Sequence, residues 1–233
     1  ELAAGEVRER LGYIVVGLGE RVLGHLGDRG RHRVRDLGRA CRGLCLRHAA
    51  SYRHPEVLEG AREVTAASAA AGLPVRDVNS SGLDHGAWVP LKIMYPEAQI
   101  PVLQMSIPTF DPEKLFEIGK KLAPLRDEGY LVIGSGFLTH GLPFLKEWTI
   151  EATPPGWSVE FDIWAKEVLT RGAVDELMNY KTLAPGLPYA HPTVEHFAPI
   201  FITLGTAVNA ESAPDIKIDG YWMGLAKTSF QVA

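Results

Sequence analysis

The chain has 233 residues and a mass of 25.5 kDa, which is enough for one large domain or two small ones. Hydrophobic residues make up 46% and charged residues 22%, the mixture of an ordinary globular protein, so a disordered chain, a fibrous repeat and a coiled coil are excluded. The net charge of −4 argues against nucleic-acid binding by the molecule as a whole.

Three features predict a cytoplasmic location without a membrane partner. No apolar run reaches the ~18 residues that a membrane-spanning helix needs. Residues 1–10 mix Ala, Glu and Arg and lack the basic and then apolar layout of a signal peptide. Cys41 and Cys45 are the two cysteines of the chain, too few for a disulfide framework or a complete zinc site.

The charge is divided unevenly along the chain. Residues 1–53 hold eleven arginines, six acidic residues and no lysine, a net of +5, whereas residues 54–233 carry −9. This shift predicts a boundary near His54, with an atypical Arg-rich segment before it. Three interpretations of residues 1–53 stay open: an arm that binds polyanions, a solvated helix or linker, and non-native sequence from a shifted reading frame.

Hydrophobic periodicity and turn residues predict the elements in chain order. Strands are expected at Leu11–Val16, Pro74–Val78, Ile100–Ile107 and Tyr130–Ile133, and helices at Pro55–Ala71, Pro112–Glu128, Trp157–Thr170 and Val174–Tyr180. Phe197–Leu204 fits either a helix or a strand, and Pro124 is expected to kink the helix that contains it. Strands that alternate with helices predict an α/β layered fold with a central, largely parallel or mixed β-sheet flanked by helices.

Three histidines stand in positions that suit chemistry. His85 is expected in a loop after Asp84, His140 follows the strand Tyr130–Ile133 and a Gly-Ser-Gly sequence, and His196 follows Glu195. A single histidine of this kind is more often structural than catalytic. Three of them next to Gly, Asp or Glu in one α/β domain favour metal binding combined with proton transfer, because imidazole does both near neutral pH.

Several ordered motifs carry a resemblance to a known family. They are LDHGAWVPLKIMYP at 83–96, IPVLQMSI at 100–107, the Gly-Ser-Gly loop that ends at His140, PTVEHFAP at 192–199 and DGYWMGLAKTSFQ at 219–231. Together they resemble the class III extradiol ring-cleavage dioxygenases, and the DOPA 4,5-dioxygenase branch in particular. The resemblance covers about residues 54–233, which are therefore interpreted as a domain of this kind.

The resemblance implies a metal-dependent enzyme. A divalent metal, Fe(II) or Zn(II), binds a small aromatic diol of the catechol type together with O2, and the ring opens beside the diol. By similarity, His196 is a metal ligand, His140 is the acid and base, and His85 contacts the substrate or O2. Asp84 either supports His85 or stabilises its loop through an Asx turn. A homo-oligomer is compatible with the sequence.

The amino-terminal motifs of the family are not found. Members carry two further metal ligands after their first two strands, and His25 and His48 are only faint counterparts. The simplest interpretation is that residues 1–53 do not represent the amino-terminal half of the family, so that two strands and two ligands are missing. His25, His32 and His48 are then interpreted as exposed surface residues. The alternative function is a catalytically inactive homologue that binds a small aromatic ligand or a partner. Polyanion binding through residues 1–53 is a third hypothesis.

Overall fold

The computed structural model describes residues 12–17, 44–48, 62, 65–66, 69, 75–78, 83–96, 102–127, 129–207 and 212–233. The strands are β1 Gly12–Gly17, β2 Leu44–His48, β3 Val75–Val78, β4 Val102–Ser106, β5 Tyr130–Gly134, β6 Asp215–Ile218, β7 Tyr221–Trp222, β8 Leu225–Ala226 and β9 Ser229–Gln231. The helices are α3 His85–Met94, α4 Pro112–Leu122, α5 Gly156–Thr170, α6 Val174–Met178, α7 Tyr180–Leu183, α8 Leu187–Ala190 and α9 Pro199–Gly205, with 3-10 turns η1 Ala123–Arg126 and η2 Leu142–Phe144.

A mixed sheet forms the centre of the fold. Within the described residues its strand order is β3-β2-β4-β1-β5, and β1 runs parallel to both β4 and β5. β2 is parallel to β3 and antiparallel to β4. The predicted α/β class with a central sheet is confirmed. The expectation that two strands are missing is wrong, because β1 and β2 come from residues 1–53 and β1 hydrogen-bonds to two neighbours in the sheet.

The predicted elements correspond closely to those observed. β4 is buried over Val102–Met105, as its apolar run indicated, and the Asp111 carboxylate accepts a hydrogen bond from Lys114 N at the start of α4. The chain changes from α to 3-10 geometry at Ala123, because Pro124 lacks the N–H that an α-helix needs. Phe197–Leu204, left open between helix and strand, becomes helix α9 from Pro199 onward. Most of the helix predicted at 55–71 lies outside the described residues; positions 62, 65, 66 and 69 are helical.

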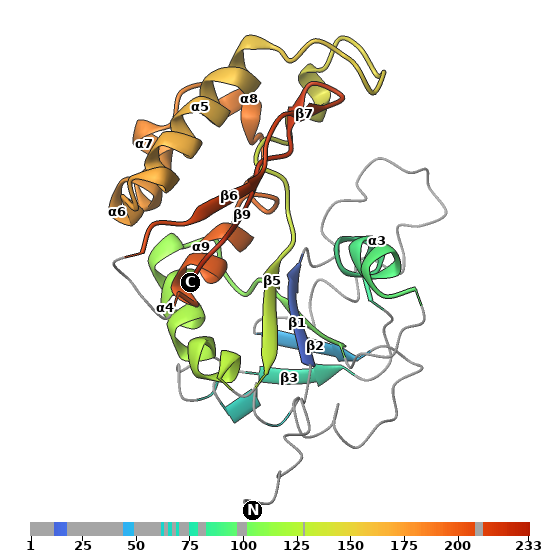
Figure 1. Ribbon diagram of the computed structural model, residues 1–233, viewed down its shortest axis with the longest axis vertical. Coiled ribbons are helices and arrows are strands. Elements are labelled where there is room, and N and C mark those ends of the chain that lie inside the picture. Colours follow the sequence, from blue (N-terminus) through green and yellow to red (C-terminus); the bar gives the residue numbers. More distant parts are fainter. Residues whose placement is uncertain are drawn as a thin grey trace, which may run out of the picture.

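Helices cover both faces of the sheet. α4 and α9 pack together on one side, with α9 against β5, and α3 lies on the other side (Figure 1). Two glycines bring α4 and α9 very close. A Cβ on Gly119 would lie 2.2 Å from the Ile202 carbonyl oxygen, and one on Gly205 would lie 2.1 Å from that of Phe116. Only glycine fits at either position.

A second layer contains α5 to α8 and the carboxyl-terminal strands. In Figure 1, α5 lies above the sheet, and the paired strands β6 and β9 pass between α5 and α9. The central core joins both layers, since Phe161 and Leu169 of α5 are buried in the same cluster as Leu115 of α4 and Phe201 of α9. The residues that follow β5 pass between the two layers, and the candidate site lies there.

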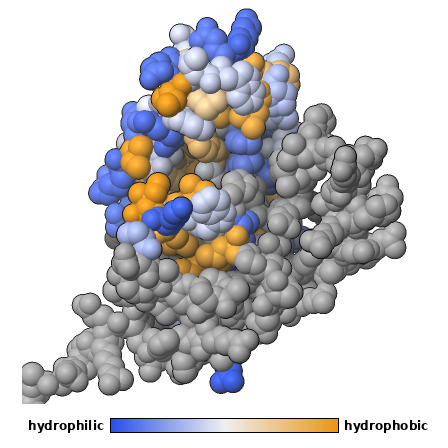
Figure 2. All heavy atoms as spheres, turned by 90° about the vertical axis from the view of Figure 1, so that its right-hand side faces the viewer, coloured by the Kyte–Doolittle hydropathy of each residue, from blue (hydrophilic) through white to orange (hydrophobic). Residues whose placement is uncertain are grey.

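The outer face of α3 is apolar and exposed. Trp88, Val89, Ile93 and Met94 are all exposed, and Ile93 retains 80% of its accessible surface. Figure 2 views the side of the molecule on which α3 lies and shows hydrophobic side chains at the surface there. A homo-oligomer stays a prediction. Among the described helices, none combines the length and the hydrophobicity that crossing a membrane requires.

Candidate functional site

The loop after β5 meets the segment that carries His196. Phe137 N donates a hydrogen bond to the His196 carbonyl oxygen at 3.0 Å. A Cβ on Gly136 would lie 2.1 Å from the same oxygen, so glycine is required for the two loops to come this close. Gly136 of the Gly-Ser-Gly sequence thus allows the loop after β5 to approach the backbone of His196.

His140 and His196 form a stacked pair. Their ring centroids lie 3.4 Å apart and their planes differ by 20°. His196 is buried and His140 is partly buried. A metal bound to imidazole lies about 2.0–2.1 Å from the nitrogen and in the plane of the ring. An ion in the plane of one stacked ring lies outside the plane of the other, so at most one of the two rings can ligate it. The arrangement is suited to one ring that ligates a metal and one ring that transfers protons.

The start of α3 lies beside the same loop. Ser135 Oγ donates to the Gly86 carbonyl oxygen at 2.6 Å, which ties the Gly-Ser-Gly loop to the residue after His85. The prediction of a loop at His85 is wrong, because His85 is the first residue of α3. The backbone of His85 thus lies near the paired histidines. The side chain of His85 is outside the described part of the structure, so its role stays a prediction.

Asp84 caps α3. Its carboxylate accepts hydrogen bonds from Ala87 N at 3.1 Å and from Gln104 Nε2 at 2.6 Å, and Asp84 N donates to Gln104 Oε1 at 2.8 Å. Both side chains are buried. These contacts hold the first turn of α3 to β4 and so fix the backbone at His85, and the support of the His85 side chain by Asp84 stays a prediction.

His191 has a structural position behind the pair. Its Nε2 lies 2.7 Å from the Leu138 carbonyl oxygen. A carbonyl only accepts, so Nε2 carries the proton, and the buried Nδ1 has no hydrogen-bond partner among the described residues. Burial lowers the pKa of His191 to about 4, although the bond to Leu138 opposes the shift. His191 is therefore neutral near pH 7 and packs between Phe161 and Phe197.

The described residues contain no cluster of three or more His, Cys, Asp or Glu side chains that could hold a metal. His196 therefore stays a predicted ligand, and these residues do not by themselves complete a metal site. β2 ends at His48, which pairs with Leu103 near the start of β4. Because β4, β1 and β5 are parallel, His48 lies at their amino-terminal ends, opposite to the carboxyl ends from which the His140 loop leaves. The topology thus separates His48 from the site, and His25 lies outside the described residues.

A cavity of about 790 Å³ borders His196 on the side of β5, a volume in the range of small-molecule sites. Apolar groups dominate its wall, and the lining residues next to the site include Gly136, Phe137, His196, Pro199, Lys227 and Thr228. Phe137 also approaches His140, with ring centroids 6.3 Å apart. A flat aromatic molecule therefore has both space and an apolar surface beside His196, while His140 does not itself line the cavity.

Polar residues that the sequence analysis did not single out support the site from α5. Ser158 and Asp162 are completely buried one helical turn apart, and both contact residues near His140 or the cavity. Two polar residues four positions apart on an otherwise apolar helix face are a pattern that can be recognised in the sequence. Their partners, however, lie up to 66 residues away in sequence, so the sequence did not indicate what they hold.

The fold and the site define an α/β protein with paired histidines at the carboxyl end of a parallel strand. Residues 47–221 match the family model described as the catalytic LigB subunit of aromatic ring-opening dioxygenase. The chain belongs to this family, which confirms the resemblance drawn from the motifs.

Two relatives and one solved structure are similar to the chain. The chain is 42% identical over 164 residues to a 4,5-DOPA dioxygenase extradiol of Beta vulgaris, a match covering 66% of this chain and 58% of the relative. For the protein of the same name from Escherichia coli K12 the identity is 38%, over 70% of this chain and 61% of the relative. The chain thus spans less than two thirds of these relatives. The crystal structure of an uncharacterized Escherichia coli K12 protein matches with a TM-score of 0.75 at 28% identity, over 97% of this chain and 87% of that one.

Proposed function

We propose that the chain is an extradiol dioxygenase that opens a catechol-type ring with O2 and depends on a divalent metal, Fe(II) or Zn(II). The stacked pair of His140 and His196 beside an apolar cavity carries this proposal, together with membership of the family. His196 is the metal ligand and His140 is the acid and base. The metal, when bound, supplies the Lewis acidity that brings the diol and O2 together.

The residues of the chain have separable tasks in this proposal. The apolar wall with Phe137 gives the flat ring a surface to pack against. The His140 imidazole takes a proton from a hydroxyl of the diol and returns one later, which requires it to be within about 2.6–3.2 Å of that oxygen. Its partly buried position against Phe137 and His196, which line the cavity, is compatible with both tasks.

Reconstitution with Fe(II) under anaerobic conditions, followed by measurement of O2 uptake with catechols, tests the proposal. We expect H196A to lose both bound metal and uptake. H140A should keep the metal and lower kcat by about 10²–10⁴, the usual contribution of general acid–base catalysis. H191Q is the matched control, because this histidine lies five positions from His196 in sequence but faces Phe161, and its metal content should equal that of the wild type.

The second candidate is an inactive homologue that binds a small aromatic ligand or a partner. It is favoured by the lack of a three-donor group among the described residues. If the wild type binds no metal and consumes no O2, while a catechol still quenches its tryptophan fluorescence and H140A weakens that binding, the second candidate replaces the first.

A further inference from the structure

A buried hydroxyl precedes the proposed acid–base residue. The side chains of Thr139 and Ser158 are completely inaccessible to solvent, and their hydroxyl oxygens lie 2.9 Å apart and share a hydrogen bond. Ala226 N donates to Thr139 Oγ1 at 2.8 Å. Valine has the shape of threonine and would fill the same space. The hydroxyl adds hydrogen bonds to Ser158 of α5 and to the Ala226 N–H of β8 at the residue before His140. We call this hydrogen-bonded group the junction.

The donors of this junction are themselves held in place. Asp162, one turn beyond Ser158 on α5, accepts hydrogen bonds from Tyr221 Oη at 3.0 Å and from Thr228 Oγ1 at 2.6 Å. These two residues flank Ala226 in the chain. The Ala226 N–H therefore projects from a segment that is attached to α5 on both sides, and Thr139 is fixed against a rigid support.

His140 is restrained on its other side as well. Its backbone N donates to the Ala190 carbonyl oxygen at 2.8 Å, and its ring stacks on His196. We propose that Thr139 is a positioning residue: its hydroxyl fixes the backbone that leads into His140 and thereby holds the imidazole over His196. The catalytic consequence rests on the proposed function, whereas the effect on the stacked rings does not.

Three variants separate positioning from simple packing. T139V removes the hydroxyl and keeps the shape of the side chain, whereas T139S keeps the hydroxyl. V168A is the control: Val168 lies in α5, the helix that carries Ser158, and its truncation weakens the buried core away from the junction. The readouts are the unfolding midpoint in urea, the NMR shifts of the His140 and His196 ring protons, and kcat and KM for a catechol.

We expect T139V to lower kcat about tenfold with KM within about twofold, since small misplacements of a catalytic group cost up to ~100-fold. It should also move the ring-proton shifts, and T139S should show the kcat and the ring-proton shifts of the wild type. V168A should lower the urea midpoint and leave kcat and the ring-proton shifts unchanged. S158A should have a smaller effect than T139V, and adding it to T139V should change little more, because both substitutions disrupt one junction.

Ring-proton shifts and a kcat like those of the wild type in T139V would overturn the proposal, as would T139S behaving like T139V. Wild-type protein without O2 uptake would overturn the proposed function alone. In that case the ring-proton shifts of T139V and T139S still decide whether the hydroxyl positions His140.

Discussion

Two helix interfaces in this protein are built on opposite principles. α4 meets α9 through Gly119 and Gly205, where backbone touches backbone and nothing polar is needed. α5 meets the loop after β5 through Ser158, which bonds to Thr139, and meets the carboxyl-terminal segment through Asp162; both side chains are completely buried. The first interface is non-directional close packing. The second is directional, because a buried polar group is costly unless its partner lies at the correct distance and angle.

The difference shows where accuracy of position matters. The α4–α9 interface supports the face of the sheet behind β5, whereas the α5 interface adjoins His140 and the cavity. Close backbone packing fixes how near the two helices approach, whereas a hydrogen-bonded junction also fixes the distance and angle of each donor and acceptor. The fold thus places its directional contacts next to the proposed chemistry, and the following variants test that contrast.

The largest expected effect is that of G205A. Its Cβ would lie 2.1 Å from the Phe116 carbonyl oxygen and 2.9 Å from Gly119 Cα, and backbone atoms of two packed helices cannot move aside cheaply. We expect a loss of more than about 3 kcal/mol in the free energy of unfolding, measured in urea. The folded fraction should keep its kcat. A loss below about 1 kcal/mol would show that the helices slide apart easily.

D162N comes next. The buried carboxylate of Asp162 accepts from Tyr221 and Thr228 and pairs with Lys166 Nζ at 2.8 Å. Removing its charge should cost about 2–3 kcal/mol of stability. Burial and the bond to Asp162 raise the pKa of Tyr221 to about 12, so ultraviolet titration of tyrosine should show one group titrating earlier in D162N than in the wild type. An unchanged titration would contradict this environment for Tyr221.

His191 makes stability depend on pH. Its pKa is lowered to about 4 in the folded state, so the unfolded chain, with an ordinary value near 6.5, binds a proton first as the pH falls. Stability from this group is complete above pH 6.5 and is lost towards pH 4, with about 2 kcal/mol lost between pH 7 and pH 5. Unfolding in urea at both pH values measures the loss, which should be smaller by that amount in H191Q. Equal losses in the two proteins would contradict a neutral buried His191.

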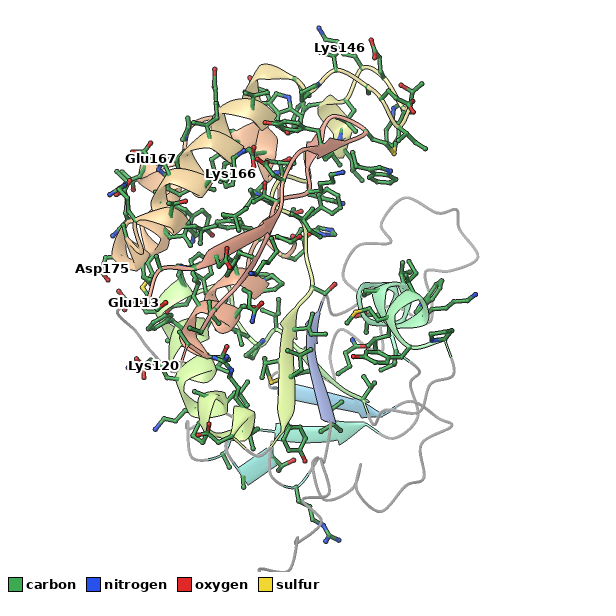
Figure 3. All side chains as sticks on the ribbon, in the orientation of Figure 1. Glu113, Lys120, Lys146, Lys166, Glu167 and Asp175 are labelled. Atoms are coloured by element: carbon green, nitrogen blue, oxygen red, sulfur yellow. The ribbon has the colours of Figure 1, made fainter. Side chains whose placement is uncertain are left out.

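The smallest effects concern two lysines on different helices (Figure 3). Lys166 bonds to Asp162 and Asp219, and these bonds raise its pKa despite partial burial, whereas Lys120 pairs with Glu117 in an exposed i,i+3 arrangement. We expect K166A to cost about 1 kcal/mol and K120A less than about 0.5 kcal/mol in urea unfolding. Equal costs would mean that the Asp162 network adds nothing to α5.

Local patterns predicted most of the elements because each depends on nearby residues. Asp111 and Pro112 begin α4, Pro124 ends its α geometry, and the apolar run of β4 is buried. Where a long-range contact decides the local structure, the prediction was wrong. His85 begins a helix because Gln104, a residue of β4, orients the capping carboxylate of Asp84. The contribution of β1 and β2 to the sheet likewise depends on strand pairing, which charge and composition do not indicate.

The amino-acid sequence by itself determines the α/β class, the family and the histidines proposed for the chemistry, because hydrophobic periodicity and ordered motifs depend on residues that are close together in sequence. Only the tertiary structure decides that His140 stacks on His196, that His48 lies at the opposite end of the strands from His140 and that Thr139 is joined to α5 and β8. Those relations join residues that are 19 to 87 positions apart, and they arise from packing and hydrogen-bond geometry that no single segment contains.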